Sequence, residues 1–331
     1  MAPAFSLLPP EQKTCGETAA TPAYMQSRRG VEFIEMGARQ ILNRCSNPQM
    51  PFAWTINPYR GCEFGCVYCY ARYTHEFLEL RDPMDFERRI FVKRRAAEVL
   101  ERTLARTPIG RDAIAIGTAT DPYQPAERTY GLTRSMLEVF ARVGGIRLSI
   151  TTKSNLVVRD LDLLKKINGR SELSVNFSLI TLNRRLQRIL EPRAPRPELR
   201  LRAMSVLAAE GIRCNLLLMP VIPGLTDSPP AVENVVAAAR RHGAADVHWR
   251  TLFLKPAAAR RFLPFIEAHF PQLGEQMRNR YGNSTYGPRA YDQQLEILFE
   301  RIKRKYGFVR VEEKAPASAR PSTQLSLGLG C

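Results

Sequence analysis

The sequence predicts an α/β protein built on a partial (β/α)6 barrel of the TIM type, with C-terminal helices and flexible termini. Three observations lead to this fold class. Six short, apolar, strand-like runs alternate with longer helical stretches. The runs read as apolar on both faces, which is typical of a parallel sheet covered by helices. The 331 residues are enough for one barrel of roughly 250 residues plus extensions, although a doubly wound sheet fits the same alternation.

The elements are expected in a regular order along the chain. Residues 31–50 are expected to form a strand followed by a short helix. The strands of the main sheet are predicted at 52–58, 113–118, 147–152, 173–179, 212–219 and 246–252. Helices are predicted near 83–106, 132–143, 160–168, 195–210 and 229–242. Beyond residue 256 the chain is expected to be helical, and an apolar stripe there is expected to pack on the barrel, formed by Leu295, Leu298, Phe299 and Ile302.

Composition divides the chain into four expected segments. Residues 1–30 lack an apolar period and are expected to form a flexible arm. Residues 31–255 hold the barrel core, and 256–311 form a helical extension. Residues 312–331 are rich in Ala, Ser and Pro, which is typical of a disordered tail.

The charge balance is strongly basic, with 49 Lys and Arg against 32 Asp and Glu and a formal charge of +17. Arginine contributes forty of these cations, and they are dense in 88–106 and 184–202. Such stripes favour a polyanion such as nucleic acid, although coding bias toward Arg or a solvated helix face explains them as well. No apolar run of about 18 residues and no signal peptide is found, so a cytoplasmic protein without a membrane partner is expected.

Three of the seven cysteines lie within eight residues. Cys62, Cys66 and Cys69 stand in NPYRGCEFGCVYCYAR, directly after a predicted strand. Gly61 and Gly65 allow the backbone to fold around a metal centre. A zinc site needs four ligands, and no second pair lies at the expected spacing. An iron–sulfur cluster with three protein ligands fits better, while a zinc knuckle with a distant fourth ligand stays open.

The CxxxCxxC spacing, with Tyr68 before the last cysteine, resembles the radical S-adenosylmethionine (radical SAM) superfamily. The longer string NPYRGCEFGCVYCYARYTHEFL, with DPYQPAE and LEPRAP downstream, is similar to bacterial proteins related to spore photoproduct lyase. The resemblance covers about 35–310. It implies a partial barrel of the radical SAM kind and a 4Fe–4S cluster on Cys62, Cys66 and Cys69. It also implies an open iron that chelates S-adenosylmethionine, cleavage to a 5′-deoxyadenosyl radical, and an electron donor of the flavodoxin or ferredoxin type.

The resemblance also implies where S-adenosylmethionine binds, along the carboxyl ends of the strands next to the cluster. The residues assigned to it in this way are Tyr68, Gly117, Thr118, Lys153, Ser154, Ser178, Arg193, Val221 and Ile222. Lys153 and Ser154 would meet the carboxylate, and Ser178 the ribose. A solvated Lys153 and a purely structural Arg193 stay open as alternatives.

The reaction is less well defined than the cofactors. The related lyase reverses a thymine dimer in DNA and places a hydrogen-donating cysteine near the end of its second strand. This chain has Gly117-Thr118-Ala119 at that point and no cysteine. Cys214 is a weak candidate for a radical role from inside the barrel, because a cysteine in an apolar strand is usually a small buried hydrophobe.

The tail suggests a partner. Residues 324–329 (QLSLGL) resemble the hexapeptide by which bacterial DNA-processing proteins bind the replication sliding clamp, with Gln324, Leu325, Leu327 and Leu329 as the contact residues. The leading hypothesis is therefore a radical SAM enzyme, of lyase or transferase type, that acts on nucleic acid as in DNA repair. Two alternatives stay open: a radical SAM enzyme that modifies a protein or a small metabolite, and a non-catalytic iron–sulfur accessory protein of DNA repair recruited to the clamp.

Overall fold

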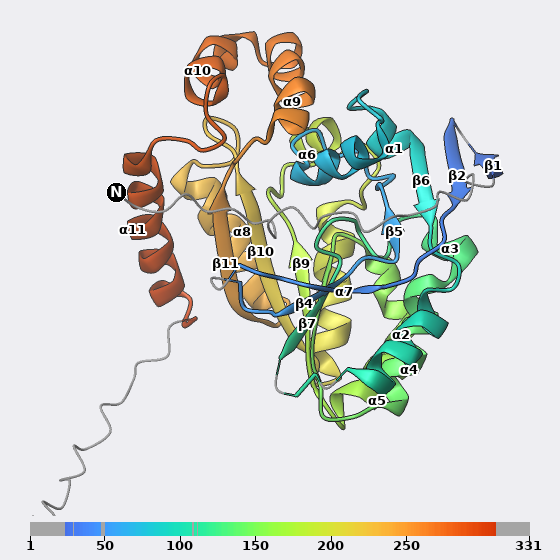
Figure 1. Cartoon of the computed structure of the whole chain (residues 1–331). Helices are drawn as coiled ribbons and strands as arrows, with labels where there is room; N and C mark the ends of the chain where they lie inside the picture. Colours follow the sequence, from blue (N-terminus) through green and yellow to red (C-terminus); the bar gives the residue numbers. More distant parts are fainter. Residues whose placement is uncertain (1–23, 29, 48–49, 108, 111, 309–331) are drawn as a thin grey trace, which may run out of the picture.

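A computed structural model describes residues 24–28, 30–47, 50–107, 109–110 and 112–308 (Figure 1). Its centre is a sheet in the order β11-β10-β9-β8-β7-β4-β3, which is open at both ends and forms no closed barrel. Six of its strands are parallel and follow one another in chain order. They are β4 (Trp54–Ile56), β7 (Ala113–Ile116), β8 (Arg147–Thr152), β9 (Glu172–Ser178), β10 (Arg213–Val221) and β11 (Ala244–Thr251). The six predicted strands and the partial barrel are confirmed.

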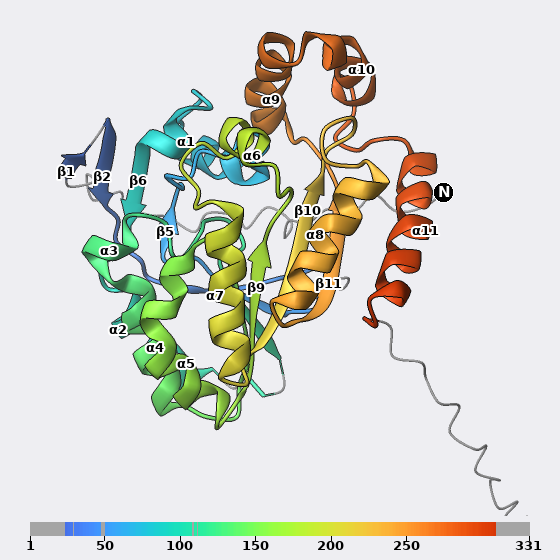
Figure 2. The same cartoon turned by 180° about the vertical axis from the view of Figure 1, so that it is seen from behind.

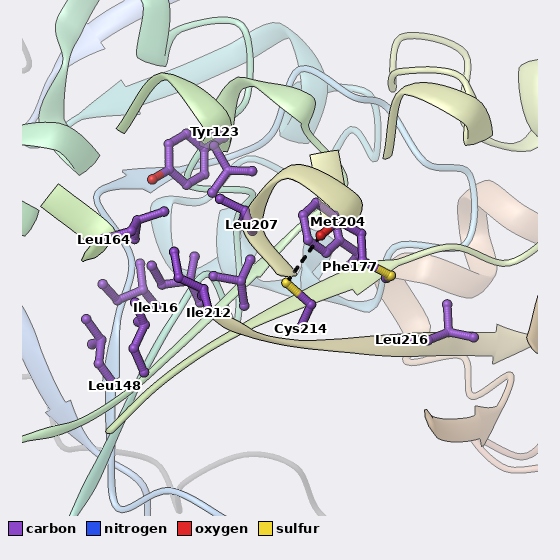
Figure 3. Packing of buried hydrophobic residues seen from close by; sticks show 14 of the residues in the cluster. Ile116, Tyr123, Leu148, Leu164, Phe177, Met204, Leu207, Ile212, Cys214 and Leu216 are labelled. Carbon is purple, nitrogen blue, oxygen red and sulfur yellow. Dashed lines mark hydrogen bonds between the residues drawn. The ribbon is translucent and has the colours of Figure 1, made fainter. Parts of the chain in front are cut away.

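Helices cover one face of this sheet. Figure 2 looks onto that layer, and in Figure 1 the strands lie in front of it. The connecting helices are α2 (Ala96–Arg106), α4 (Leu132–Arg142), α5 (Leu161–Asn168), α7 (Pro197–Ala209) and α8 (Pro229–Arg241). The strand side chains that face them are apolar and buried, as Figure 3 shows for Leu148, Phe177 and Leu216. This outer face of the sheet therefore holds the main core.

The opposite, inner face carries polar as well as apolar side chains, which corrects the expectation of strands that are apolar on both sides. In β8 and β9, Ile150 and Val175 are buried in the core, whereas the next residues along, Thr151 and Asn176, line a cavity. A strand alternates its side chains between two faces, and in these two strands most of the positions that face the cavity are polar. A closed barrel would fill its interior with apolar side chains, and this open sheet leaves the inner face for a site.

The region before β7 differs from the prediction. Residues 83–106 do not form one helix, because β6 (Arg89–Val92) separates α1 (Asp85–Arg88) from α2. Ile90 and Val92 are fully buried in β6, which pairs with β2 (Val31–Glu35) in a four-stranded sheet of order β1-β2-β6-β5. β1 (Tyr24–Arg28) falls inside the expected flexible arm, and β5 is Tyr59–Arg60.

The short helix expected within 31–50 does not form either. β3 (Leu42–Arg44) takes its place and pairs antiparallel with β4 at the edge of the main sheet. Ile41 and Leu42 are completely buried there, so core packing outweighs helix propensity.

The chain beyond β11 is helical, as expected. Its helices are α9 (Pro256–His269), α10 (Pro271–Tyr281) and α11 (Arg289–Lys305). Leu295, Phe299 and Ile302 of α11 are buried, and the Phe299 ring stacks on Trp249 of β11 at 4.8 Å. The shorter elements are η1 (Tyr70–Leu78), α3 (Glu127–Tyr130), η2 (Asn155–Asp160) and α6 (Arg184–Leu190). None of the helices in the described part of the chain has both the length and the apolar character to cross a bilayer.

Candidate active site

The three clustered cysteines lie in an irregular loop between β5 and η1. Cys62, Cys66 and Cys69 all line a cavity of about 2270 Å³ that extends over the inner face of the sheet. Gly61 has φ +90°, and a Cβ there would lie 2.8 Å from the Phe86 carbonyl oxygen. Glycine is therefore needed to turn the chain tightly into this loop.

The thiols are shielded from water on one side and open to the cavity on the other. Burial raises the pKa of Cys66 to about 12 and also raises those of Cys62 and Cys69. A metal centre must therefore displace their protons when it binds. Within the described ranges, no three His, Cys, Asp or Glu side chains form the ligand set of a single metal ion. A 4Fe–4S cluster binds each thiolate at a different iron, so three separated thiols beside a cavity fit it.

Two buried ion pairs hold this loop. Arg72 Nη2 lies 2.6 Å from Glu87 Oε2 and donates to the Cys66 carbonyl oxygen at 2.9 Å. Arg200 pairs with Glu191, and Tyr68 Oη donates to the same carboxylate. The side chains of Arg200 and Glu191 are completely buried. Arg72 therefore binds the loop backbone directly, and the Arg200–Glu191 pair holds the Tyr68 side chain of the loop.

The carboxyl ends of the strands carry the next set of polar groups. Lys153 Nζ, just after β8, donates to Ser178 Oγ at the end of β9 at 2.9 Å, and it lies 5.8 Å from the centre of the Tyr68 ring. Gly117, after β7, has φ +90°, and a Cβ there would lie 2.6 Å from the Thr151 carbonyl oxygen. Thr118 Oγ1 accepts from Asn57 Nδ2 at 3.1 Å. These side chains and backbone groups surround the cavity next to the cysteine loop.

Comparisons with known proteins agree with this geometry. The sequence profile of the Radical SAM superfamily matches residues 56–233. The chain belongs to the radical SAM superfamily. Members of this superfamily use a 4Fe–4S cluster and S-adenosylmethionine, so the expected cofactors are those of the family.

The relatives span most of this radical SAM chain. An uncharacterized protein of Mycobacterium tuberculosis is 33% identical over 299 residues, 90% of this chain and 86% of the relative. An uncharacterized protein of Methanocaldococcus jannaschii is 26% identical over 275 residues, 83% of this chain and 95% of its own. Among solved structures, a spore photoproduct lyase variant with bound AdoMet and dinucleoside spore photoproduct has a TM-score of 0.60. It is 18% identical and covers 83% of this chain and 79% of that one, which shows a shared fold.

The structure brings most of the predicted site residues of this radical SAM protein to one cavity. The predicted residues that line it are Cys62, Cys66, Tyr68, Cys69, Gly117, Thr118, Lys153 and Ser178. Ser154 is not among the lining residues, because its Oγ accepts from the Leu156 backbone N at 3.2 Å and caps η2. Asp121, next to it, orients this end of β8 by accepting from Thr152 Oγ1 and from the Lys153 backbone N, both at 2.7 Å.

Besides Ser154, three predicted residues do not present side chains to the cavity. The side chains of Val221 and Ile222 are completely buried in two apolar clusters, and Met219 and Pro220 line the cavity instead. Arg193 is exposed behind the cysteine loop, where Nη2 lies 3.8 Å from Glu87 Oε1. This contact favours the structural alternative for Arg193.

Cys214 does not face the inside of the barrel, where a radical role would require it to lie. Its side chain belongs to the core behind the sheet, where Sγ lies 3.8 Å from the Met204 carbonyl oxygen (Figure 3). Burial there raises its pKa to about 12. Position 214 precedes the cavity-lining Asn215 in β10, so strand alternation directs its thiol to the helices.

The residues around Arg200 were missed by sequence reasoning. Glu191 stands in the LEPRAP string that carries the resemblance, but the resemblance assigns a role only to Arg193 of that string. The Arg-rich stretch 184–202 also differs from expectation, because Arg184, Arg193 and Arg200 each face a carboxylate and none of them lines the cavity.

The cavity has its own positive charge. Nine of the described Lys and Arg residues line it: Arg39, Arg44, Arg60, Lys93, Arg147, Lys153, Arg213, Arg250 and Lys303. Only three carboxylates do: Asp121, Glu172 and Asp246. The ratio is three to one, against about one and a half to one for the whole sequence, so cations are concentrated at this site.

Proposed function

We propose that this chain is a radical SAM enzyme that holds a 4Fe–4S cluster on Cys62, Cys66 and Cys69, cleaves S-adenosylmethionine, and acts on nucleic acid in a repair-type reaction. When bound, the cluster and S-adenosylmethionine supply a 5′-deoxyadenosyl radical, which abstracts hydrogen. One observation supports the choice of substrate: the cavity that begins at the cysteine loop is lined by nine cations and three carboxylates.

Residues of the chain itself provide the binding surface next to the loop. Lys153 Nζ would offer a positive charge to the carboxylate of S-adenosylmethionine, and Ser178 Oγ, which accepts from Lys153, would hydrogen-bond the ribose. Gly117 permits close backbone approach, since any side chain there would collide with Thr151 and Pro122. The enzyme requires an external reductant, which we expect to be of the flavodoxin or ferredoxin type.

The size and charge of the cavity favour a polyanion over a small metabolite. Pockets for small molecules usually enclose about 300–1,000 Å³. This cavity of about 2270 Å³ has room for a segment of a larger substrate beside the cofactor. Phosphate groups are the anions that clustered Arg and Lys side chains bind in nucleic acids. A repair substrate would present its backbone to these cations.

The cofactor assignment is tested by anaerobic reconstitution with iron and sulfide. Wild-type protein should hold about four iron atoms per chain and release 5′-deoxyadenosine when reduced with S-adenosylmethionine present. Cys66→Ala should lose cluster and product together. Cys45→Ala is the matched control, because Cys45 also lines the cavity but lies outside the loop. Iron binding without any 5′-deoxyadenosine would support the accessory protein instead of the enzyme.

The substrate assignment is tested by filter binding to single-stranded DNA over a series of salt concentrations. The affinity should fall steeply with salt, and Arg213→Gln should reduce the slope of log K against log salt by about 1. Arg184→Gln is the control, because Arg184 pairs with Glu198 and does not line the cavity. Absent or salt-independent binding, with 5′-deoxyadenosine still formed, would favour a protein or metabolite substrate.

Two further expectations concern partners and location. The clamp motif Gln324–Leu329 lies outside the described residues, so its role stays a prediction. A peptide pull-down with the bacterial clamp, comparing wild type with Gln324→Ala/Leu327→Ala, tests it, and equal retention would contradict it. We place the enzyme in the cytoplasm, where a nucleic-acid substrate and a reductant are both available.

A further inference from the structure

A chain of neutral polar side chains crosses the inner face of the sheet. Asn215 Nδ2 of β10 donates to Asn176 Oδ1 of β9 at 2.9 Å, and Asn176 Nδ2 donates to Ser149 Oγ of β8 at 2.8 Å. Asn176 and Asn215 are direct partners in the register of the two strands. All three residues line the cavity. The strands therefore hold these groups in a fixed row, which we call the amide row.

The amide row ends in an unsatisfied group. Asn215 Oδ1 is buried and has no hydrogen-bond partner among the described residues, and the whole residue is 6% exposed. Buried polar atoms in folded proteins are nearly always paired, since an unpaired one is destabilising. Leu217, two residues along the strand and on the same cavity face, shows that this face accepts a large apolar residue. An asparagine whose Oδ1 faces no partner among the described residues, on a face that also accepts leucine, indicates that a ligand supplies the missing donor.

The free polar groups of Asn215 differ in chemistry from the Lys and Arg side chains that line the cavity. A carboxamide carries two N–H donors and an acceptor oxygen, and Asn215 uses one N–H within the row. It therefore retains a donor beside a free acceptor. Phosphate offers only acceptors and would leave Oδ1 unpaired. A nucleobase edge presents a donor next to an acceptor, and Asn and Gln pair with such edges in both positions.

We propose that Asn215, oriented by Asn176 and Ser149, binds the hydrogen-bonding edge of a nucleobase that has been drawn out of its stack into the cavity. This inference rests on the proposed function and specifies which part of the nucleic acid the inner face recognises. The cations of the cavity would bind the phosphates, while the amide row would form hydrogen bonds with a base. Enzymes that act on a base commonly extrude it into a pocket and read its edge in this way.

The test compares two probes that carry the same phosphates. One is a fluorescein-labelled single-stranded oligothymidylate, and the other has every thymine methylated at N3, which removes the edge N–H. Anisotropy is measured at one salt concentration with the reconstituted full chain and S-adenosylmethionine. The wild type should bind the unmethylated probe about 10-fold more tightly or better. Asn215→Leu should bind both probes with the weaker affinity of the methylated one.

Ser174→Ala is the matched control. Ser174 lines the same face, opposite Ser149 in the register, but takes no part in the amide row, so this variant should keep the wild-type discrimination. Ser149→Ala serves as a second test if Asn215→Leu does not fold, as judged by circular dichroism and iron content. This variant removes the hydroxyl that accepts from Asn176 Nδ2. The difference in affinity between the two probes should then shrink severalfold.

The outcomes separate this inference from the proposed function. Equal affinity of wild type for both probes, or discrimination that survives in Asn215→Leu, would overturn the base-edge site and leave nucleic-acid binding intact. Failure of both probes to bind would overturn the nucleic-acid substrate and the base-edge site together.

Discussion

The core behind the sheet and the packing beneath the cysteine loop are equally buried but are built from different side chains. Behind the sheet, residues such as Phe177 and Leu216 are apolar and 0% exposed. Beneath the loop, five buried residues are ionisable, and we call them the loop support. They are Arg72, His75, Glu87, Glu191 and Arg200, with exposures of 2%, 1%, 3%, 0% and 0%.

The difference follows from what each backbone can do for itself. Strands and helices pair their own N–H and C=O groups, so the side chains between them can be apolar. The cysteine loop has no such regular pairing. Arg72 donates to the Cys66 carbonyl oxygen, and Arg200 pairs with Glu191, which accepts from Tyr68 Oη of the loop. The loop is therefore held by buried charges, whose stability depends on complete pairing.

The largest effect is expected from breaking the Arg200–Glu191 pair. Burial alone would raise the pKa of Glu191, but the charges of Arg200 and Lys153 outweigh it and hold that pKa below its usual value. Glu191→Gln leaves Arg200 buried without its counter-charge, which should lower the free energy of unfolding by about 3–5 kcal/mol in urea denaturation.

The control for this prediction is a pair at the surface. Glu198→Gln removes the exposed partner of Arg184 and should change the stability by less than about 1 kcal/mol. The double variant Glu191→Gln/Arg200→Met should recover part of the loss. Equal effects of the two single variants would show that the buried pair contributes no more than a surface one.

A second, smaller loss of stability should differ between substitutions on the two faces of one strand. Leu216 is 0% exposed in the core behind the sheet, whereas its neighbour Leu217 lines the cavity. Leu216→Ala leaves a void among packed atoms and should cost about 3 kcal/mol of unfolding free energy. Leu217→Ala only widens an existing space and should cost less than half as much. Similar losses in urea denaturation would mean that the inner face is packed as tightly as the outer one.

The strands and the cysteine motif were predictable because their signals are local. Alternation such as Arg147–Thr152, and three cysteines within eight residues, can be read from neighbouring positions. The same alternation distinguishes the two faces, so the outward thiol of Cys214 and the inward amide of Asn215 could have been assigned from strand parity.

Other features depend on contacts between distant residues. β6 forms because Ile90 and Val92 are buried in a second sheet, about 55 residues along the chain from its partner β2. The roles of Glu191 and Arg200 depend on how LEPRAP folds back beneath Tyr68, for which the sequence offers no periodic signal. Likewise, Val221 and Ile222 follow the strand end as expected, but the surrounding packing turns their side chains away from the cavity.

The smallest effect concerns the pH dependence of the loop support. Burial lowers the pKa of His75 to about 4, from about 6.5 in an unfolded chain. Its Nε2 lies 2.9 Å from the Arg89 carbonyl oxygen, and Nδ1 is buried without a partner among the described residues. The unfolded state therefore binds more protons than the folded state between these two pH values. The stability contributed by neutral His75 is complete above pH 6.5 and is lost as the pH falls toward 4.

Urea denaturation of the cluster-free protein at several pH values should reveal this contribution. Between pH 6.5 and 4.5, the wild type should lose about 2 kcal/mol more stability than His75→Gln, which has no titrating ring. His269→Gln is the control, because His269 is exposed on α9 and should leave the wild-type slope unchanged. Parallel pH profiles for wild type and His75→Gln would mean that the histidine is hydrated in solution. The loop support would then differ from the core behind the sheet in the charge of its side chains but not in their exclusion of water.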